Sequence, residues 1–217
     1  MTRAEDVEWA TACGVDAVGF VAVPKSRRYV TPEQIAALAL LVPPMVARVA
    51  LFQNADAREV KAVLEQAPIE ILQFHGEETS EFCEQFGRPY WKALPCGGVA
   101  ESALSEHLTQ AWLAHPRASA ILIDGHAPGA LGGSGESVSW ANLRVALRTL
   151  AQRGLEGDLQ PRWILAGGLN PDNVVTAIRE SGAHAIDISS GVEAAPGQKA
   201  REPLRRLVEA VHCGFDG

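Results

Sequence analysis

Short apolar runs alternate with longer amphipathic segments along the whole chain. Each run has four to seven residues rich in Val, Ile, Leu and Ala, the pattern of a strand buried on both faces. We expect strands over residues 17–21, 46–52, 70–74, 90–94, 120–124, 163–166 and 185–188. Because helical segments separate successive runs, the sequence predicts a parallel sheet joined by helical crossovers.

Residues that start and stop helices divide the segments between these runs. Thr31 followed by Pro32 is typical of a helix start, as is Asp56, and Gly14 and Gly87 each stop a helical pattern. The predicted helices cover residues 6–13, 32–41, 57–66, 80–86, 101–114, 140–153, 170–181 and 201–211. The pattern therefore gives seven strands and eight helices, and the chain opens almost directly on a helix.

Composition and charge narrow the class of protein. The 217 residues are 47% hydrophobic, enough for a packed core, and we expect one domain over residues 1–217. No apolar run reaches the roughly 18–20 uncharged residues of a membrane span. A net charge of −7 disfavours nucleic-acid binding over the general surface. The first ten residues are acidic, unlike a secretory signal, so a cytoplasmic protein without membrane partners is expected.

The four cysteines, Cys13, Cys83, Cys96 and Cys213, are widely spaced and form no CxxC pair. In a cytoplasmic chain of this size we expect free thiols rather than disulfides. Because no histidine stands at metal-ligand spacing from them, no metal is expected.

Three glycine-rich turns lie in the last third of the chain, at residues 132–135, 167–170 and 189–192. Each follows a predicted strand. Glycine at a strand end lets backbone N–H groups approach an anion, and a following helix adds partial positive charge. In an eight-stranded β/α barrel, the loops after the last two strands usually bind phosphate. The turns therefore predict a TIM (β/α)8 barrel, of α/β class, with a phosphorylated small-molecule ligand.

Six stretches, taken together and in order, resemble one enzyme family. They are 14–20 (GVDAVGF), 24–30 (PKSRRYV), 73–76 (QFHG), Asp124 with 132–135 (GGSG), 166–174 (AGGLNPDNV) and 187–193 (DISSGVE). Over essentially its full length the chain resembles phosphoribosylanthranilate isomerase, a family of tryptophan biosynthesis. Each stretch alone is a weak signal, whereas all six at the family's spacing are a strong one.

The resemblance implies an Amadori rearrangement of N-(5-phosphoribosyl)anthranilate to 1-(2-carboxyphenylamino)-1-deoxyribulose 5-phosphate. The furanose ring opens to a Schiff base, which isomerises through an enolamine. This chemistry needs an acid at the ring oxygen and a base at C2, and the resemblance implies neither a cofactor nor a metal. The implied partner is the small-molecule phosphoribosyl substrate, bound by a monomer or a homodimer.

Asp124 stands where the family has its general acid, at the end of a predicted strand. The apolar residues 121–123 would desolvate its carboxyl group and favour the protonated form. A strand-end Asp also caps turns such as the one at Gly125, so a structural role is the alternative. We expect a catalytic role because the phosphate turns follow it.

Arg28 matches the family arginine in the loop after strand 17–21. Its guanidinium can hold the substrate's carboxylate by a two-pronged contact that lysine cannot copy. The resemblance therefore implies a catalytic-site role for Arg28. The alternative is a solvated basic loop formed with Lys25 and Arg27.

The glycine turns supply the expected binding residues for substrate and phosphate: Gly133, Ser134, Gly135, Gly167, Gly168, Ser189, Ser190 and Gly191. His75 and Gln73, at a strand end, either line the pocket or form structural hydrogen bonds. Asp187, just before the third turn, is either an inward-facing structural carboxylate or a substrate contact.

The family begins with a strand carrying Lys-Ile-Cys-Gly, whose cysteine is the general base, and Met1 aligns just after this motif. The expected fold is therefore a barrel whose first strand is missing. Either Met1 is an internal methionine of a longer protein, or the shorter chain is a damaged or repurposed barrel. Of the four cysteines only Cys96, after strand 90–94, could reach the pocket as a substitute.

Two other functions stay open. A related isomerase of histidine biosynthesis performs the same chemistry with two aspartates, although the early strand-end Asp that it needs is absent. A phospho-sugar binding barrel without turnover fits the absence of the base. Its unpaired strand edges would favour self-association.

Overall fold

A single parallel sheet forms the centre of the computed structural model, which describes residues 1–126, 138–152 and 162–215. Its six strands run in the order β1-β2-β3-β4-β5-β6, so each helical crossover joins neighbouring strands. The strands are β1 (Ala17–Val21), β2 (Ala47–Phe52), β3 (Ile71–Phe74), β4 (Tyr90–Pro95), β5 (Ala120–Asp124) and β6 (Trp163–Ala166). The predicted α/β class and parallel sheet are confirmed.

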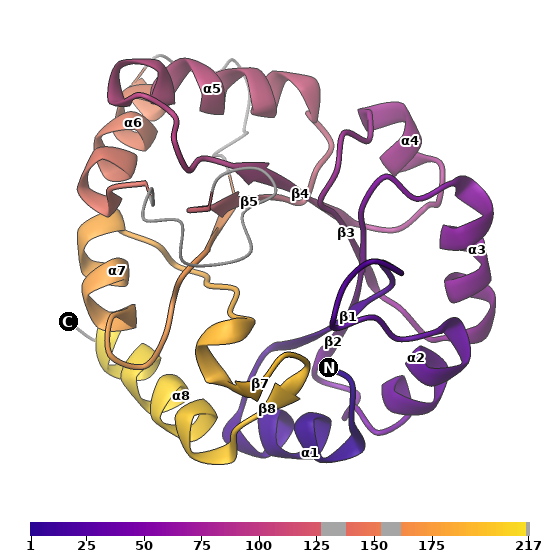
Figure 1. Ribbon diagram of the computed structural model, residues 1–217. Helices are drawn as coiled ribbons and strands as arrows, with labels where there is room; N and C mark the ends of the chain where they lie inside the picture. The colour runs from indigo at the N-terminus through magenta and orange to yellow at the C-terminus, as the bar shows by residue number, and fades with distance from the viewer. Residues whose placement is uncertain (127–137, 153–161, 216–217) are drawn as a thin grey trace.

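Helices surround the sheet as a ring in which the last helix packs beside the first (Figure 1). They are α1 (Ala4–Cys13), α2 (Pro32–Ala39), α3 (Ala57–Gln66), α4 (Ser80–Glu84), α5 (Glu101–Ala114), α6 (Trp140–Gln152), α7 (Val174–Ser181) and α8 (Arg201–Phe215). None of the helices in the described ranges has the length and apolar character needed to cross a membrane.

The predicted helix starts and stops explain several of these boundaries. The Thr31 side chain accepts a hydrogen bond from the Gln34 backbone N–H, and Asp56 accepts two from the first turn of α3. Gly14 ends α1 at a φ of 88°, a left-handed conformation that glycine adopts without a Cβ penalty. These local signals were sufficient because each cap is made by residues close in sequence.

Helix α7 begins four residues later than predicted. The Asn170 side-chain oxygen accepts hydrogen bonds from the backbone N–H groups of Asp172 (2.9 Å) and Asn173 (3.2 Å). This side chain therefore holds a turn where a helix would need the same backbone groups. A short hairpin was also not predicted; it follows the 3-10 turn η1 (Ser190–Val192) and comprises β7 (Glu193–Ala195) and β8 (Gln198–Lys199).

The predicted strand at residues 185–188 is reduced to one isolated bridge. The Leu165 N–H donates to the Ala185 carbonyl (2.9 Å), and the Asp187 N–H donates to the Leu165 carbonyl (2.8 Å). The bridge pairs Leu165 with Ile186 in the parallel sense, as a seventh strand would. On its other side this segment has no strand partner within the described ranges, so regular pairing does not extend.

The sheet is open between β1 and this bridged segment. The Asp16 carbonyl and the Ala22 N–H each form a hydrogen bond with β2. Because the backbone groups of successive residues in a parallel strand point to alternate sides, those of Gly19 face away from β2. A cavity of about 510 Å³ lies between the two edges and is lined from both, by Gly19 and Val21 on β1 and by Ile186 among others. The described residues therefore form a six-stranded half-barrel with a seventh strand position, rather than a closed barrel.

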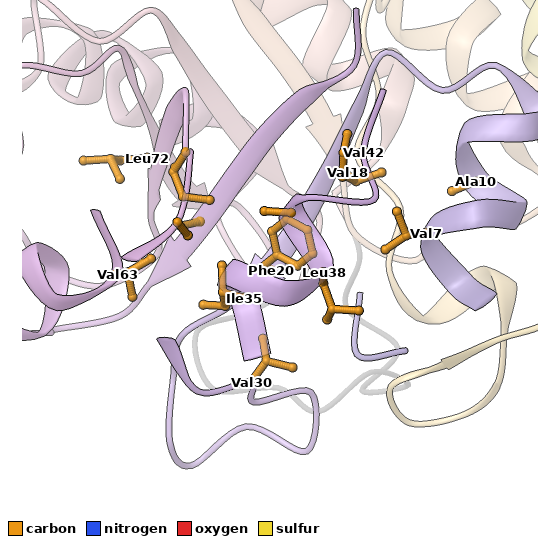
Figure 2. Packing of buried hydrophobic residues seen from close by; sticks show 14 of the residues in the cluster. Val7, Ala10, Val18, Phe20, Val30, Ile35, Leu38, Val42, Val63 and Leu72 are labelled. Carbon is orange, nitrogen blue, oxygen red and sulfur yellow. The ribbon is translucent and has the colours of Figure 1, made fainter. Parts of the chain in front are cut away.

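Apolar side chains between sheet and helices make up the larger core. In β1, Val18 and Phe20 are buried against the helices and contribute to the same cluster as Ile35 and Leu38 of α2 (Figure 2). Because strand residues alternate between faces, the same strand can supply this core and also line the interior cavity.

An aromatic cluster anchors the middle of the sheet to α4. The ring of Phe74, fully buried on β3, lies 5.9 to 6.2 Å from those of Phe52, Phe82, Phe86 and Tyr90. Tilted and edge-on pairs at such distances add to the free energy gained by burial. Phe74 therefore fixes the end of β3, from which His75 enters the site described below.

Replacing Phe74 by alanine is expected to lower the free energy of unfolding by about 3–5 kcal/mol, because the cavity left in this cluster cannot fully collapse. Urea unfolding followed by circular dichroism measures the change. Leu113→Ala is the control, because Leu113 is 65% exposed and its loss should cost less than about 0.5 kcal/mol. Equal losses in the two variants would contradict the packing described here.

Candidate active site

Polar side chains and tight turns gather where the parallel strands end. Asp124 is the last residue of β5, His75 follows β3, and Gly167 follows β6. The carboxyl ends of parallel strands meet at one edge of a barrel-type sheet, which is where such folds carry their sites. The structure therefore brings together several of the residues predicted from the sequence.

The Asp124 carboxylate lies between two histidines. Its Oδ2 is 3.4 Å from His75 Nε2, and its Oδ1 is 3.0 Å from His126 Nδ1. The His126 backbone N–H also donates to Oδ1, at 3.0 Å. The side chain is 22% exposed, so these contacts and not bulk water set its protonation state.

The contacts around Asp124 overturn one expectation. Burial acts to raise the pKa of this carboxyl group, as predicted, but the hydrogen bonds from His75 and His126 outweigh it and hold the pKa below its ordinary range. The carboxylate is therefore ionised at neutral pH. Apolar neighbours along the strand were visible in the sequence, whereas the two hydrogen-bonding histidines become visible only in the fold.

Asp187 has the opposite environment. Burial raises the pKa of its carboxyl group, and the opposing effects of nearby His75 and Lys199 do not offset it. The negative charge of Asp124 adds to the increase. Two neighbouring carboxyl groups are thus driven in opposite directions, an arrangement typical of sites that move protons.

Gly167 lies directly against the acidic side chain. Its φ of 89° is left-handed, and a β-carbon built on it would collide with Asp124 Oδ1 and lie 2.5 Å from the Gly125 nitrogen. No residue with a side chain fits here without displacing the carboxylate. The predicted need for glycine at this turn therefore has a steric reason beyond access for an anion.

The two predicted phosphate turns are in contact with each other. A β-carbon built on Gly191 would collide with the Leu169 carbonyl oxygen and lie 3.0 Å from Asn170 Cα. Gly191 thus packs against the turn that begins at Gly167 and Gly168. Phosphate binding by these turns stays a prediction, as it does for Ser189 and Ser190.

Gly133, Ser134 and Gly135, predicted to contact the substrate, lie outside the described residues. The site is therefore characterised here from the turns after β3, β5 and β6 and from residues 187–199.

Arg28 already holds a carboxylate of the protein. Its Nε and Nη2 donate to the two oxygens of Glu193, at 2.8 and 2.7 Å. This pair raises the pKa of Arg28 and lowers that of Glu193. Lys199 also contacts Glu193 Oε1, at 3.3 Å, and donates to the Ser189 carbonyl, at 2.7 Å. Arg28 is thus tied to the third glycine turn, whereas Lys25 and Arg27 are exposed.

A buried ion pair fixes the turn that carries His75. Glu78 accepts hydrogen bonds from the backbone N–H groups of Asn54 (2.6 Å) and Gly76 (2.9 Å). Lys92 donates to the Gly76 carbonyl at 2.6 Å and lies 3.8 Å from Glu78. Such a pair is weak evidence for stability, but its hydrogen bonds restrict the position of this turn and so of His75.

The buried thiols are unsuited to act as a general base. Cys96 is fully buried, and burial together with the nearby Asp124 charge raises its pKa to about 12. Burial likewise raises the pKa of Cys83 to about 12. The suggestion that Cys96 could serve from the pocket is therefore not supported. All four cysteines are free thiols, as expected.

Sequence reasoning missed three residues of this site: His126, Glu193 and Lys199. Glu193 stood in the stretch 187–193, but nothing in the sequence marked it as the partner of Arg28. His126 gave no signal beyond its position two residues after Asp124. In the described ranges no group of three or more His, Cys, Asp or Glu side chains is arranged to hold a metal ion.

The architecture and these contacts define a protein of the parallel β/α-barrel class, with a carboxylate–histidine site at the C-terminal ends of its strands. The family description N-(5'phosphoribosyl)anthranilate (PRA) isomerase matches residues 1–210. The chain belongs to this family of isomerases, which serves tryptophan biosynthesis.

Known proteins agree with this membership over nearly the whole chain. The N-(5'-phosphoribosyl)anthranilate isomerase of Azotobacter vinelandii is 42% identical, over 97% of this chain and 94% of that protein. The crystal structure of phosphoribosyl anthranilate isomerase from Thermotoga maritima has a TM-score of 0.82 at 30% identity, over 98% of this chain and 96% of that chain.

One similar structure holds a ligand. It is a phosphoribosyl anthranilate isomerase in complex with reduced 1-(o-carboxyphenylamino)-1-deoxyribulose 5-phosphate. Its TM-score is 0.78 at 30% identity, over 98% of this chain and 95% of that chain. That protein therefore accommodates a phosphorylated sugar joined to a carboxyphenyl group in the same fold.

The burial of the thiols predicts an order of reactivity. At about pH 8 the exposed Cys213 is expected to react with a disulfide reagent first, because thiolate fraction and access control the rate. Cys83 and Cys96 should react only when the chain is unfolded. Mass spectrometry of timed samples, with an unfolded sample as control, measures the order, and rapid labelling of Cys96 in the folded chain would contradict it.

Proposed function

We propose that this chain converts N-(5-phosphoribosyl)anthranilate to 1-(2-carboxyphenylamino)-1-deoxyribulose 5-phosphate by an Amadori rearrangement. The observation that carries the proposal is the contact between the reactive group and the predicted anion turns. Gly167 packs against Asp124 Oδ1, and Gly191 packs against the same turn. A phosphate held there would leave the sugar ring of the substrate within reach of the carboxylate and its histidines.

In the first step a proton moves to the ring oxygen of the furanose. The bond between C1 and this oxygen breaks, and the nitrogen lone pair forms the C1=N bond of a protonated Schiff base. Asp124 and its partner His75, 3.4 Å apart, share the proton that is given up. Because the carboxylate is ionised at rest, it has to regain a proton through a hydrogen-bonded neighbour, and His75 is in contact with it.

In the second step a base removes the proton from C2. The electron pair of the broken C2–H bond forms the C1=C2 bond of the enolamine. The electrons of the C1=N double bond return to the nitrogen. The hydroxyl on C2 then loses its proton as C1 gains one, which leaves the ketone at C2. Atoms and electrons balance without a redox partner.

Arg28 would recognise the carboxylate on the anthranilate ring. Glu193 engages the side of the fork formed by Nε and Nη2. Arginine has five N–H donors, so the Nη1 side is the one that a substrate carboxylate would use. Glu193 then holds the guanidinium in a fixed orientation for this second carboxylate.

The fold component of the proposal is a barrel with eight strand positions. Six are filled by β1 to β6, and the bridge at Ile186 marks the seventh. The open side beside Gly19, with its cavity of about 510 Å³, corresponds to the eighth. A strand at this position would pair with the backbone groups that β1 directs away from β2.

A second function, binding of a phosphorylated sugar without turnover, is favoured by one observation. Cys83 and Cys96 are buried thiols with a pKa of about 12, so neither provides a thiolate at the strand ends for the C2 proton. Measuring turnover of N-(5-phosphoribosyl)anthranilate and binding of its product on the same preparation separates the two functions. Binding with no turnover would establish the second function.

Replacing Asp124 by asparagine is expected to lower kcat by about 10²–10⁴-fold, because the amide cannot take part in proton transfer. KM should change little, since size and polarity are retained. Steady-state turnover of N-(5-phosphoribosyl)anthranilate measures both constants. Glu65→Gln, the same carboxyl-to-amide change on an exposed residue of α3, is the control, and equal activity of the two variants would refute the role of Asp124.

Replacing Arg28 by lysine is expected to raise KM about tenfold or more while kcat changes less, because the charge remains and the two-pronged geometry is lost. Thermal unfolding monitors whether loss of the Glu193 pair also loosens the fold. An unchanged KM in a stably folded variant would contradict carboxylate recognition by Arg28.

A further inference from the structure

His126 has two ring nitrogens that face two different parts of the site. Nδ1 lies 3.0 Å from Asp124 Oδ1, and the backbone N–H of the same residue bonds the same oxygen. On the other side of the ring, Nε2 lies 3.8 Å from the position that a β-carbon on Gly168 would take. The imidazole thus spans the distance between the reactive carboxylate and the second glycine turn.

This orientation is fixed at both ends of the residue. The paired bonds to Asp124 hold the main chain and the Nδ1 edge, so the ring cannot turn without losing one of them. Gly168, with its left-handed φ of 68°, presents bare backbone to the Nε2 edge. Any side chain at Gly168 would stand between the imidazole and the turn. The Nε2 edge of the imidazole therefore lies next to the backbone of this turn.

We propose that His126, as an imidazolium, is a direct ligand of the substrate's phosphate group through Nε2–H while its Nδ1–H remains bonded to Asp124. The identity of the molecule that carries the phosphate rests on the function proposed above. The role of His126 as a ligand requires only that a tetrahedral dianion binds at the turns of Gly168 and Gly191. His126 then links occupation of the phosphate site to the state of the acidic group.

The surrounding charges favour this protonation state when an anion is bound. The titratable groups near Asp124 and His126 are His75 after β3, Cys96 after β4 and Asp187, and Asp187 in turn lies near Lys199. A dianion at the turn and the ionised Asp124 would lie on opposite edges of one imidazolium, and each stabilises its positive charge.

The pH dependence follows from which form binds. The imidazolium offers two N–H donors, whereas the neutral ring offers one, so the bound state holds its proton more tightly than the free state. Anion affinity is therefore expected to be higher at low pH, where imidazoles are protonated, than at high pH.

Sulfate is the probe that tests the proposal, because its charge stays constant over the range of pH used and any pH dependence belongs to the protein. Calorimetric titration of the full chain between about pH 5.5 and about pH 8.5 should show affinity falling by about tenfold or more, the loss expected for one charged hydrogen bond. His126→Asn keeps a donor near Asp124 but cannot reach the turn. It should bind sulfate about tenfold more weakly at low pH, with a flat profile.

His126→Gln keeps the reach towards Gly168 and should recover part of the low-pH affinity while staying independent of pH. His212→Gln, an exposed position on α8, is the matched control and should retain both the affinity and the slope. Circular dichroism melting curves verify that each variant is folded.

Three results would overturn the proposal. The first is that His126→Asn keeps the full sulfate affinity and its full dependence on pH, and the second is that this pH dependence disappears in His75→Asn but not in His126→Asn. The third is that the unaltered chain binds no sulfate up to about 50 mM. None of these measurements requires turnover. Sulfate binding that depends on His126 in a chain without isomerase activity would support the ligand and reject the proposed reaction. Isomerase activity in a chain whose sulfate binding does not depend on His126 would support the proposed reaction and reject His126 as a phosphate ligand.

Discussion

The close approach of Asp124 to the backbone of Gly167 is the constraint on which the rest of the site depends. A β-carbon at Gly167 has no room beside the carboxylate, so the turn after β6 can pass there only as glycine. The same turn continues through Gly168 to Leu169, whose carbonyl group is in contact with Gly191. The register of β5 with β6 pairs Asp124 with Ala166, so the two strands end beside each other. Because Gly167 has no side chain, the residue after β6 can then contact the Asp124 carboxylate. The Asp124 carboxylate and the two glycine turns are neighbours for this steric reason.

Neighbouring groups shift the pKa values of Asp124 and Asp187 in opposite directions. Two histidines stabilise Asp124 as an anion, whereas burial favours the neutral form of Asp187. Each effect is local, since hydrogen bonds to the charged form lower a carboxyl pKa and loss of water raises it. The two neighbouring carboxyl groups therefore differ in how readily each holds a proton.

Ion pairs next to the site hold the turn of His75 and the side chain of Arg28 in place. Lys92 and Glu78 hold the turn of His75, and Glu193 holds Arg28 while also receiving Lys199. Replacing such pairs by apolar residues need not reduce stability. Their contribution is to fix geometry, since each charge also bonds backbone groups or a second partner. Part of this network, Arg28, Glu193 and Lys199, also lines the cavity on the open side of the sheet beside β1.

Sequence patterns were enough to predict six strands in a parallel sheet, several helix caps and the family. These features depend on local periodicity, on caps made within a few residues, or on motifs that can be read in order. The sequence also marked Asp124, Arg28 and the glycine turns. Only the tertiary structure decided that Asp124 is ionised, that Arg28 is engaged by Glu193, that Cys96 is buried, and that residues 185–188 form a bridge instead of a strand. Protonation, pairing and burial depend on groups separated by up to 165 positions in the chain, and no local pattern specifies which of them meet.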